Sequence, residues 1–310
     1  MQNLTSLSQT SAGNIIAAKG FSVLGTFSGG GQVTAGKTYY VSKQGNGQGG
    51  LSWSTAFTTL AAAITANNLD VATYTNVFNY IYVDGGNYTE SLVAFPNHAI
   101  VIGVGVPSDG PRVNGSVVLT SSPSVCHFYN MQFRANTAAP CVDMSDVTAQ
   151  GVEFHHCLFN NTSGVAFTYG VCFGSANYYN KIVDCSFIGN PSVLTAIHCE
   201  GPENAFMDIR GNTISAVTTG ILFDGWGAGI GYSDYQVYIR DNIICRTDPN
   251  SGSQLVTGIN FADTQSRSHA TIVNNYIAAA TPLVGHNTYC TMHNIENIAG
   301  DGRIIVEETT

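Results

Sequence analysis

The sequence predicts an all-β protein, a parallel β-helix in which short strands coil into a tube with one turn of the coil per sequence repeat. Composition gives the first indication. Only 10% of the 310 residues are charged, against roughly 25% in an average soluble protein, and 34 residues are glycine. Tyr and Phe, 15 each, favour strands over helices. The strongest indication is an apolar pattern, broken by a polar turn, that recurs about every 27 residues.

The repeat is clearest when the second apolar residue after each turn is aligned. We call these positions the anchors: Phe133, Phe159, Phe187, Ile214, Ile244, Ile277 and Ile298. Five residues before the first six anchors lies another large apolar residue: Phe128, Phe154, Ile182, Ile209, Ile239 and Ile272. A β-sandwich, the alternative fold, predicts turns every 8–12 residues or so and no long period. The long period therefore favours the coil.

A column of cysteines and asparagines lies two residues before the middle anchors. Side chains two apart in a strand point to the same face, so this column shares the inward face of the anchors. A buried amide is costly unless it is hydrogen-bonded, and stacked amides can bond from one turn to the next. We therefore expect a structural ladder inside the tube, made of Cys157, Cys185, Asn212, Asn242 and Asn275.

The N-terminal end divides into an arm and a cap. Residues 38–310 are expected to form the β-helix domain, and a short helix at about residues 54–66 is expected to cover its first turn. Ser54 can cap this helix, and its predicted apolar face holds Phe57, Leu60, Ala61 and Ile64. Residues 1–37 are nearly uncharged, and they are either an unordered terminus or an extended arm that docks on a partner or is exchanged between subunits.

A stretch at the start of the coil carries a resemblance to a known family. Residues 39–105 contain "YYVSKQGNGQGGLSWSTAFTTLAAAI", "IYVDGGNYTESL" and "IVIGVG". This stretch resembles the start of right-handed β-helix proteins of the pectate-lyase-like superfamily, including its phage virion and tailspike members. The resemblance implies a right-handed coil. It implies no single activity, because the superfamily holds lyases, hydrolases, tailspikes and virion proteins that are not enzymes.

Two acidic residues follow a further predicted strand of the repeat, at residues 195–199 and 219–223. In register, Glu200 and Asp224 would be outward neighbours about 5 Å apart, close to the roughly 5–5.5 Å between the carboxyl groups of retaining glycosidases. They are the catalytic candidates if the chain is an enzyme, although acids at strand ends also occur without function. His198 and Trp226 lie nearby and are candidate glycan-binding residues.

On the first strand of each repeat, charged residues alternate in sign from turn to turn. We interpret Glu153, Lys181 and Asp208 as a structural ion ladder on the outer face.

No cofactor and no metal are expected. The eight cysteines occur singly, without any C-x-x-C pair, as is typical of small buried side chains. His155 and His156 are adjacent on a strand and so point in opposite directions. The sequence also has no Asp-rich calcium loop.

Charge and hydropathy exclude two classes of partner. The net charge is −9 and no Lys/Arg cluster exists, which argues against nucleic acid. No apolar run approaches the ~18–20 residues of a membrane helix. The first residues lack the basic and apolar parts of a secretory signal, so we expect synthesis in a host cytoplasm without export by that route.

Two functions are compatible with these observations. The first is a structural virion protein of a tailed bacteriophage, on the particle exterior as capsid decoration or as a tail-associated spike. It would be a homotrimer bound to capsid or tail proteins through residues 1–37, with Ile243 and Tyr276 hinting at a contact between copies. The alternative is a carbohydrate-active enzyme, a polysaccharide lyase or glycoside hydrolase such as a tailspike depolymerase, that acts on a host surface glycan.

Overall fold

The computed structural model describes residues 36–299, with gaps at 75–76, 106–109, 137–138, 162–167, 175, 189–194, 202–203, 216–217, 225–234, 246–254, 263–267, 285–290 and 296–297. Most of the predicted arm (residues 1–35) and Trp226 therefore lie outside the described residues.

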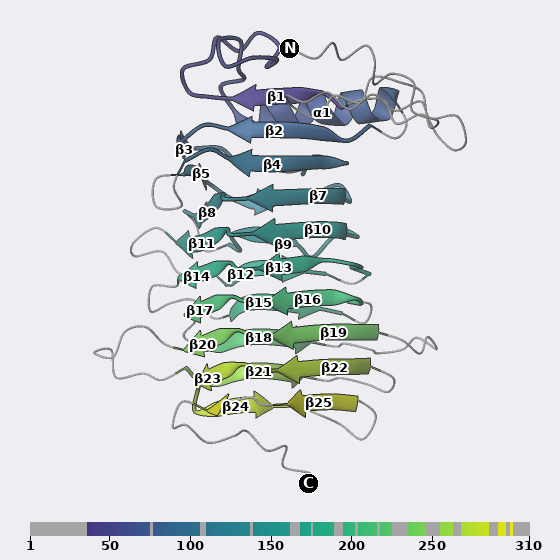
Figure 1. Cartoon of the computed structure of the whole chain (residues 1–310), viewed down its shortest axis with the longest axis vertical. Coiled ribbons are helices and arrows are strands. Elements are labelled where there is room, and N and C mark those ends of the chain that lie inside the picture. The colour runs from purple at the N-terminus through teal and green to yellow at the C-terminus, as the bar shows by residue number, and fades with distance from the viewer. Residues whose placement is uncertain are drawn as a thin grey trace, which may run out of the picture.

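The chain folds as a parallel β-helix, as the repeat predicted. Its described strands form three sheets, and every strand pairs in parallel with the equivalent strands of the neighbouring turns. Figure 1 shows the turns stacked along the long axis of the molecule, from β1 at one end to β25 at the other. The coil is right-handed, as is the rule for parallel strands joined by crossovers.

The first sheet has ten strands in the described part of the chain. They are β1 (Thr38–Val41), β2 (Asn79–Val83), β4 (Ala99–Gly103), β7 (Ser124–Tyr129), β10 (Gln150–His155), β13 (Lys181–Val183), β16 (Met207–Arg210), β19 (Tyr235–Arg240), β22 (Ser268–Val273) and β25 (Thr291–Ile295).

The second and third sheets have nine and seven described strands. The second holds β3 (Gly86–Tyr88), β5 (Pro111–Asn114), β8 (Gln132–Ala135), β11 (Leu158–Asn161), β14 (Ser186–Ile188), β17 (Thr213–Ser215), β20 (Ile243–Cys245), β23 (Tyr276–Ala278) and β26 (Ile298–Ala299). The third holds β6 (Val117–Val118), β9 (Val142–Met144), β12 (Tyr169–Phe173), β15 (Thr195–Glu200), β18 (Thr219–Asp224), β21 (Thr257–Ala262) and β24 (Thr281–Val284).

The anchors form one column of the second sheet. Phe133, Phe159 and Phe187 are partners in successive turns, and their rings stack. The column continues in register to Ile277. The prediction for the last anchor is wrong, because Ile298 pairs with Tyr276 and Ala299 takes the place opposite Ile277. The alternation of apolar residues is weak at this end of the chain, so the sequence did not fix the register of the last turn.

The predicted ladder runs inside the tube beside this column. The backbone N–H of Cys185 donates to Asn212 Oδ1 at 2.9 Å. The N–H of Asn212 donates to Asn242 Oδ1, and that of Asn242 to Asn275 Oδ1, both at 3.0 Å. At the other end, Cys157 N–H points to Cys185 Sγ at 3.4 Å. Each side chain thus accepts from the turn before it, which satisfies backbone groups that the corner leaves unpaired.

A single left-handed residue before each ladder position makes the corner between the first and second sheets. These corner residues are His156, Asp184, Gly211, Asp241 and Asn274, with φ between 52° and 66°. Asn, Asp and His are enriched in this region of backbone space, and Gly enters it without penalty. This explains why the repeat places a short polar residue or Gly just before Cys or Asn.

A column of small residues lets the third sheet approach the anchors. It consists of Gly170, Ala196, Gly220 and Gly258. A Cβ at Gly220 would lie 2.5 Å from Ile244 Cγ2, and one at Gly258 would overlap Ile277 Cγ2. The third sheet therefore packs directly against the anchor side chains at these positions.

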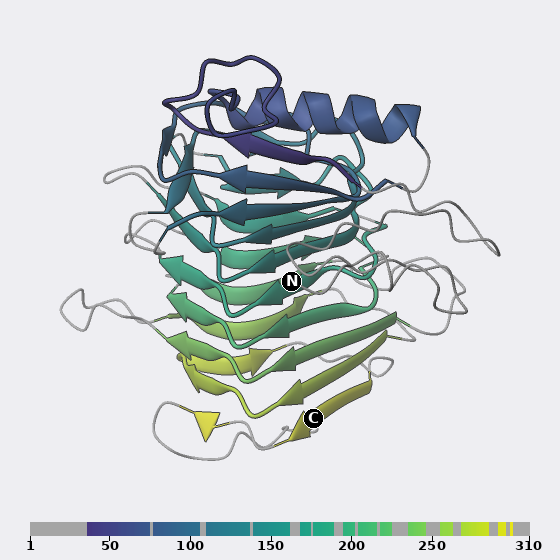
Figure 2. The same ribbon diagram turned by 45° about the horizontal axis from the view of Figure 1, so that its top comes forward.

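The cap helix α1 (Leu60–Thr73) begins and ends later than the predicted range of 54–66. It lies across the N-terminal end of the coil (Figure 2). Its cap is Thr59, whose side chain accepts from Ala62 N–H at 3.2 Å. Glu90 adds a carboxylate that accepts from the N–H groups of Leu60 and Ala61, each at 2.9 Å. The negative carboxylate also suits the positive end of the helix dipole.

Candidate functional site

The candidate site lies on the outer face of the third sheet, across β12, β15 and β18. Two residues of each of these strands point into the core, such as Ile197 and Cys199 of β15. The position between them points outward, and in successive turns it is occupied by Cys172, His198 and Leu222. The sheet thus brings together side chains that are 24 to 26 positions apart in the sequence.

Glu200 and Asp224 are direct partners in neighbouring turns, as the sequence predicted. Glu200 is exposed and Asp224 is half-buried. The next partner in this row is Ala262, so the acidic row ends at Asp224. The described residues form no salt bridge to either carboxylate.

His198 points outward from the sheet and is nevertheless only 3% exposed. Its ring stacks on that of Tyr169, with 4.3 Å between the ring centroids. Burial lowers the pKa of His198, although the nearby carboxylates of Glu200, Asp224 and Asp143 act in the opposite direction. The imidazole is therefore neutral at pH 7. A glycan could reach His198 only if the groups that cover it moved.

Cys172 contacts the imidazole of His198 from the neighbouring strand β12. The distance between its Sγ and His198 Nδ1 is 3.5 Å. Burial raises the pKa of the Cys172 thiol, and the charges of Asp143 and Glu200 raise it further. The thiol is therefore protonated at neutral pH, and the pair lacks the thiolate that a cysteine nucleophile needs.

Sequence reasoning missed Cys172, Tyr169 and Asp143 as members of this site. Cys172 and Tyr169 lie in the segment "YGVCF", and Asp143 is the partner of Cys172 in the preceding turn. The signal was present, because aligning "YGVCF" with "TAIHC" would have placed Cys172 beside His198.

A second cluster of charges surrounds Glu153 on the first sheet. Lys181 Nζ donates to Glu153 Oε1 at 2.6 Å, and His155 Nε2 lies 2.8 Å from Oε2. Burial alone would raise the pKa of Glu153, but the bonds to His155 and Lys181 outweigh it and lower the pKa to about 2. Asp208 is paired instead with Arg240 and Arg210. The Glu153–Lys181 pair is one step of the predicted ion ladder, whereas the salt bridges of the described residues join Asp208 to the two arginines and not to Lys181.

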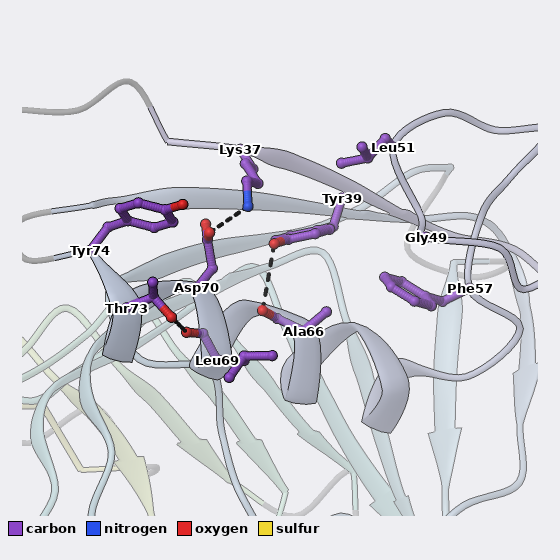
Figure 3. A pocket seen from close by; sticks show the side chains of 10 residues that line it. All are labelled: Lys37, Tyr39, Gly49, Leu51, Phe57, Ala66, Leu69, Asp70, Thr73 and Tyr74. Atoms are coloured by element: carbon purple, nitrogen blue, oxygen red, sulfur yellow. Dashed lines mark hydrogen bonds and ion pairs between the residues drawn. The ribbon is translucent and has the colours of Figure 1, made fainter.

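A pocket of about 420 Å³ lies beside the cap helix, where the described chain begins. Figure 3 shows Lys37 and Asp70 pointing toward each other across it, 2.5 Å apart. Tyr39 and Tyr74 lie on either side, and the rest of the lining is mainly apolar. Its charges are already paired, so we assign it no chemistry.

Comparison with known proteins adds little. No known protein family matches the chain, and no curated protein matches it. Among solved structures, the chain is similar to a mutant pectin methylesterase in complex with a hexasaccharide. The identity is 10% and the TM-score 0.49, over 87% of this chain and 91% of the other. A likeness of that size says nothing about activity. None of the described segments forms a helix long and apolar enough to cross a membrane.

Proposed function

We propose that the chain is a structural β-helix module that associates with copies of itself through the outer face of its second sheet. The module would stand on the exterior of a tailed-phage particle, as capsid decoration or as part of a tail spike. Residues 39–105 resemble a superfamily that includes phage virion and tailspike proteins, and this resemblance supports a location on the phage particle. Residues 1–37 would dock on capsid or tail proteins, after synthesis in the host cytoplasm.

The observation that carries the proposal is an uncharged surface on the second sheet. The accessible outward positions of β14, β17, β20 and β23, which we call the neutral face, are Ser186, Ile188, Thr213, Ile243, Cys245, Tyr276 and Ala278. Three of them are large apolar side chains with substantial exposure: Ile188 at 50%, Ile243 at 47% and Tyr276 at 40%. The first sheet differs, because its outer face carries Glu153, Lys181 and Asp208.

Charge argues for a second copy as the occupant of the neutral face. Each chain carries a net charge of −9, so two copies repel each other over most orientations. They approach at the lowest electrostatic cost where neither presents a charge. Three chains with their neutral faces turned toward a common axis give a closed homotrimer, in which these apolar side chains leave water.

The test places one charge on the neutral face. Tyr276→Asp should convert the assembly to monomers, because each contact would bury an unpaired carboxylate. Tyr80→Asp is the matched control, since Tyr80 has the same 40% exposure on a strand of the first sheet. Light scattering of the purified proteins measures the mass. An unchanged mass in Tyr276→Asp, or equal loss in both variants, would contradict the proposal.

A carbohydrate-active enzyme is the second candidate, and the in-register pair of Glu200 and Asp224 favours it. In that case Glu200→Gln and Asp224→Asn should each abolish the release of reducing ends from a surface polysaccharide, without changing the melting temperature. A wild-type protein that cleaves no polysaccharide of its host would remove this candidate.

A further inference from the structure

We propose that Cys172, His198 and Glu200 bind one divalent transition-metal ion, and that Zn²⁺ is the ion that fits them best. The proposal goes beyond the structural role of the chain and does not depend on it. It also departs from the expectation of no metal that the isolated cysteines suggested.

The distances suit a tetrahedral ion. The sulfur of Cys172, a ring nitrogen of His198 and a carboxylate oxygen of Glu200 all lie within 4.8 Å of one another. The thiol, which is protonated without the ion, releases its proton to solvent when the sulfur binds the ion. Cys172 Sγ and His198 Nδ1 are 3.5 Å apart. With Zn–S of about 2.3 Å and Zn–N of about 2.0 Å, two ligand atoms of a tetrahedral site are separated by about 3.5 Å. The exposed side chain of Glu200 has the freedom to complete the set.

The backbone holds the three ligands rigidly. Cys172 and His198 are direct partners on the paired strands β12 and β15. His198 and Glu200 are two positions apart on β15, so they point to the same side of the sheet. Ligands carried by strands are positioned more precisely than ligands on loops.

A plain thiol–imidazole hydrogen bond accounts for only part of the arrangement. His198 Nε2 is buried and has no hydrogen-bond partner among the described residues. A buried polar atom left without a partner is destabilising, so such an atom calls for an explanation. With the ion on Nδ1, beside Cys172 Sγ, the proton of the neutral ring lies on Nε2, which then donates to a carboxylate or water as in most His–metal sites. The free Nε2 is therefore compatible with the ion, and the case for the ion rests on the ligand distances.

The surrounding charge also favours a cation. Asp143 is the partner of Cys172 in the preceding turn, and Asp224 is the partner of Glu200 in the following one. The salt bridges of the described residues neutralise none of the carboxylates of Asp143, Glu200 and Asp224. Sulfur and imidazole ligands select Zn²⁺ and similar ions over Ca²⁺ and Mg²⁺, which prefer oxygen alone.

The test uses Co²⁺ as a spectroscopic substitute and Zn²⁺ as a competitor on the full chain. Wild-type protein should bind one Co²⁺ with the charge-transfer absorption of a thiolate–cobalt bond, and Zn²⁺ should displace it. Cys172→Ser should abolish that absorption and weaken Zn²⁺ binding by about 100-fold or more in calorimetry. Cys245→Ser is the control, because Cys245 is a free cysteine on another sheet.

Glu200→Gln keeps the proposal testable if Cys172→Ser folds poorly. Glu200 is exposed, so its replacement should leave the fold intact and lower Zn²⁺ affinity about tenfold or more. The proposal is overturned if wild-type protein shows no thiolate–cobalt absorption, if the absorption survives in Cys172→Ser, or if Cys245→Ser removes it.

Discussion

At the scale of single residues, the stability of the tube depends on buried polar side chains that hydrogen-bond to the equivalent residues of the neighbouring turns. Asn242 shows this best, because its Oδ1 accepts from both the backbone N–H and the Nδ2 of Asn212. Its own Nδ2 donates to the Ile209 carbonyl and to Asn275 Oδ1. A buried asparagine with four bonds is more constrained than an apolar residue of the same size, and this is why the repeat keeps it.

Asn242→Ala should destabilise the protein by about 2–4 kcal/mol, because it removes the acceptor of the buried backbone N–H and Nδ2 of Asn212 and the donor to the Ile209 carbonyl and Asn275 Oδ1. Urea unfolding followed by circular dichroism measures the change. Asn260→Ala is the control, since Asn260 points outward on the third sheet, and we expect a change within about 0.5 kcal/mol. Equal effects of the two substitutions would show that the ladder contributes no special stability.

Glu153 makes a pH-dependent contribution to stability. Its folded pKa of about 2 lies below the ordinary value of 4.5, so the contribution is present above pH 4.5 and is lost as the pH falls toward 2. Glu153→Gln should lower the free energy of unfolding by about 1–2 kcal/mol at pH 7 and by much less at pH 3. A loss that is the same at both pH values would contradict this assignment.

At the scale of elements, the corner and the small-residue column explain how three sheets close into a tube. Gly220 lies where the third sheet meets Ile244 of the second. A Cβ at Gly220 would lie 2.5 Å from Ile244 Cγ2 and 2.5 Å from the carbonyl oxygen of Gly258. A tightly packed interior of this kind resists added volume.

Gly220→Ala should therefore destabilise the protein by about 1–3 kcal/mol through overpacking, in contrast to the usual gain from replacing glycine in a strand. Thermal unfolding measures it. Ala262→Val, which adds volume at an outward position of the same sheet, should change stability little. If Gly220→Ala stabilises the protein, the third sheet has room that the structure does not show.

The helix shows why element boundaries were harder to predict than the repeat. Ser54 and Phe57 suggested a start six residues too early, since a serine before an apolar stripe is a valid local signal. The true start at Leu60 depends on Glu90, which lies 30 positions later and reaches back to cap the helix. Local sequence patterns carry no information about such a contact.

The third-sheet site was predictable only in part, for a similar reason. The pairing of Glu200 with Asp224 followed directly from the spacing of the repeat. The burial of His198 could not be predicted in this way. The alternation of residues in a strand predicts which way a side chain points, but not which groups cover it. Cys172 belongs to no sequence motif, so only the alignment of its strand with that of His198 places it in the site.

At the scale of the whole molecule, the sheets differ in what they present to the surroundings. The first sheet carries ion pairs such as Glu153–Lys181 and Asp208–Arg240, the third carries acids around a buried histidine, and the second presents the neutral face. In an acidic chain, an exposed surface with large apolar side chains and no charge favours association with copies of itself.

Sedimentation equilibrium of the full chain at physiological ionic strength tests this central claim most directly. The account predicts one species with three times the 32.8 kDa mass of the chain. A mass that stays at 32.8 kDa across the concentration range would contradict it, because the neutral face would then remain in water.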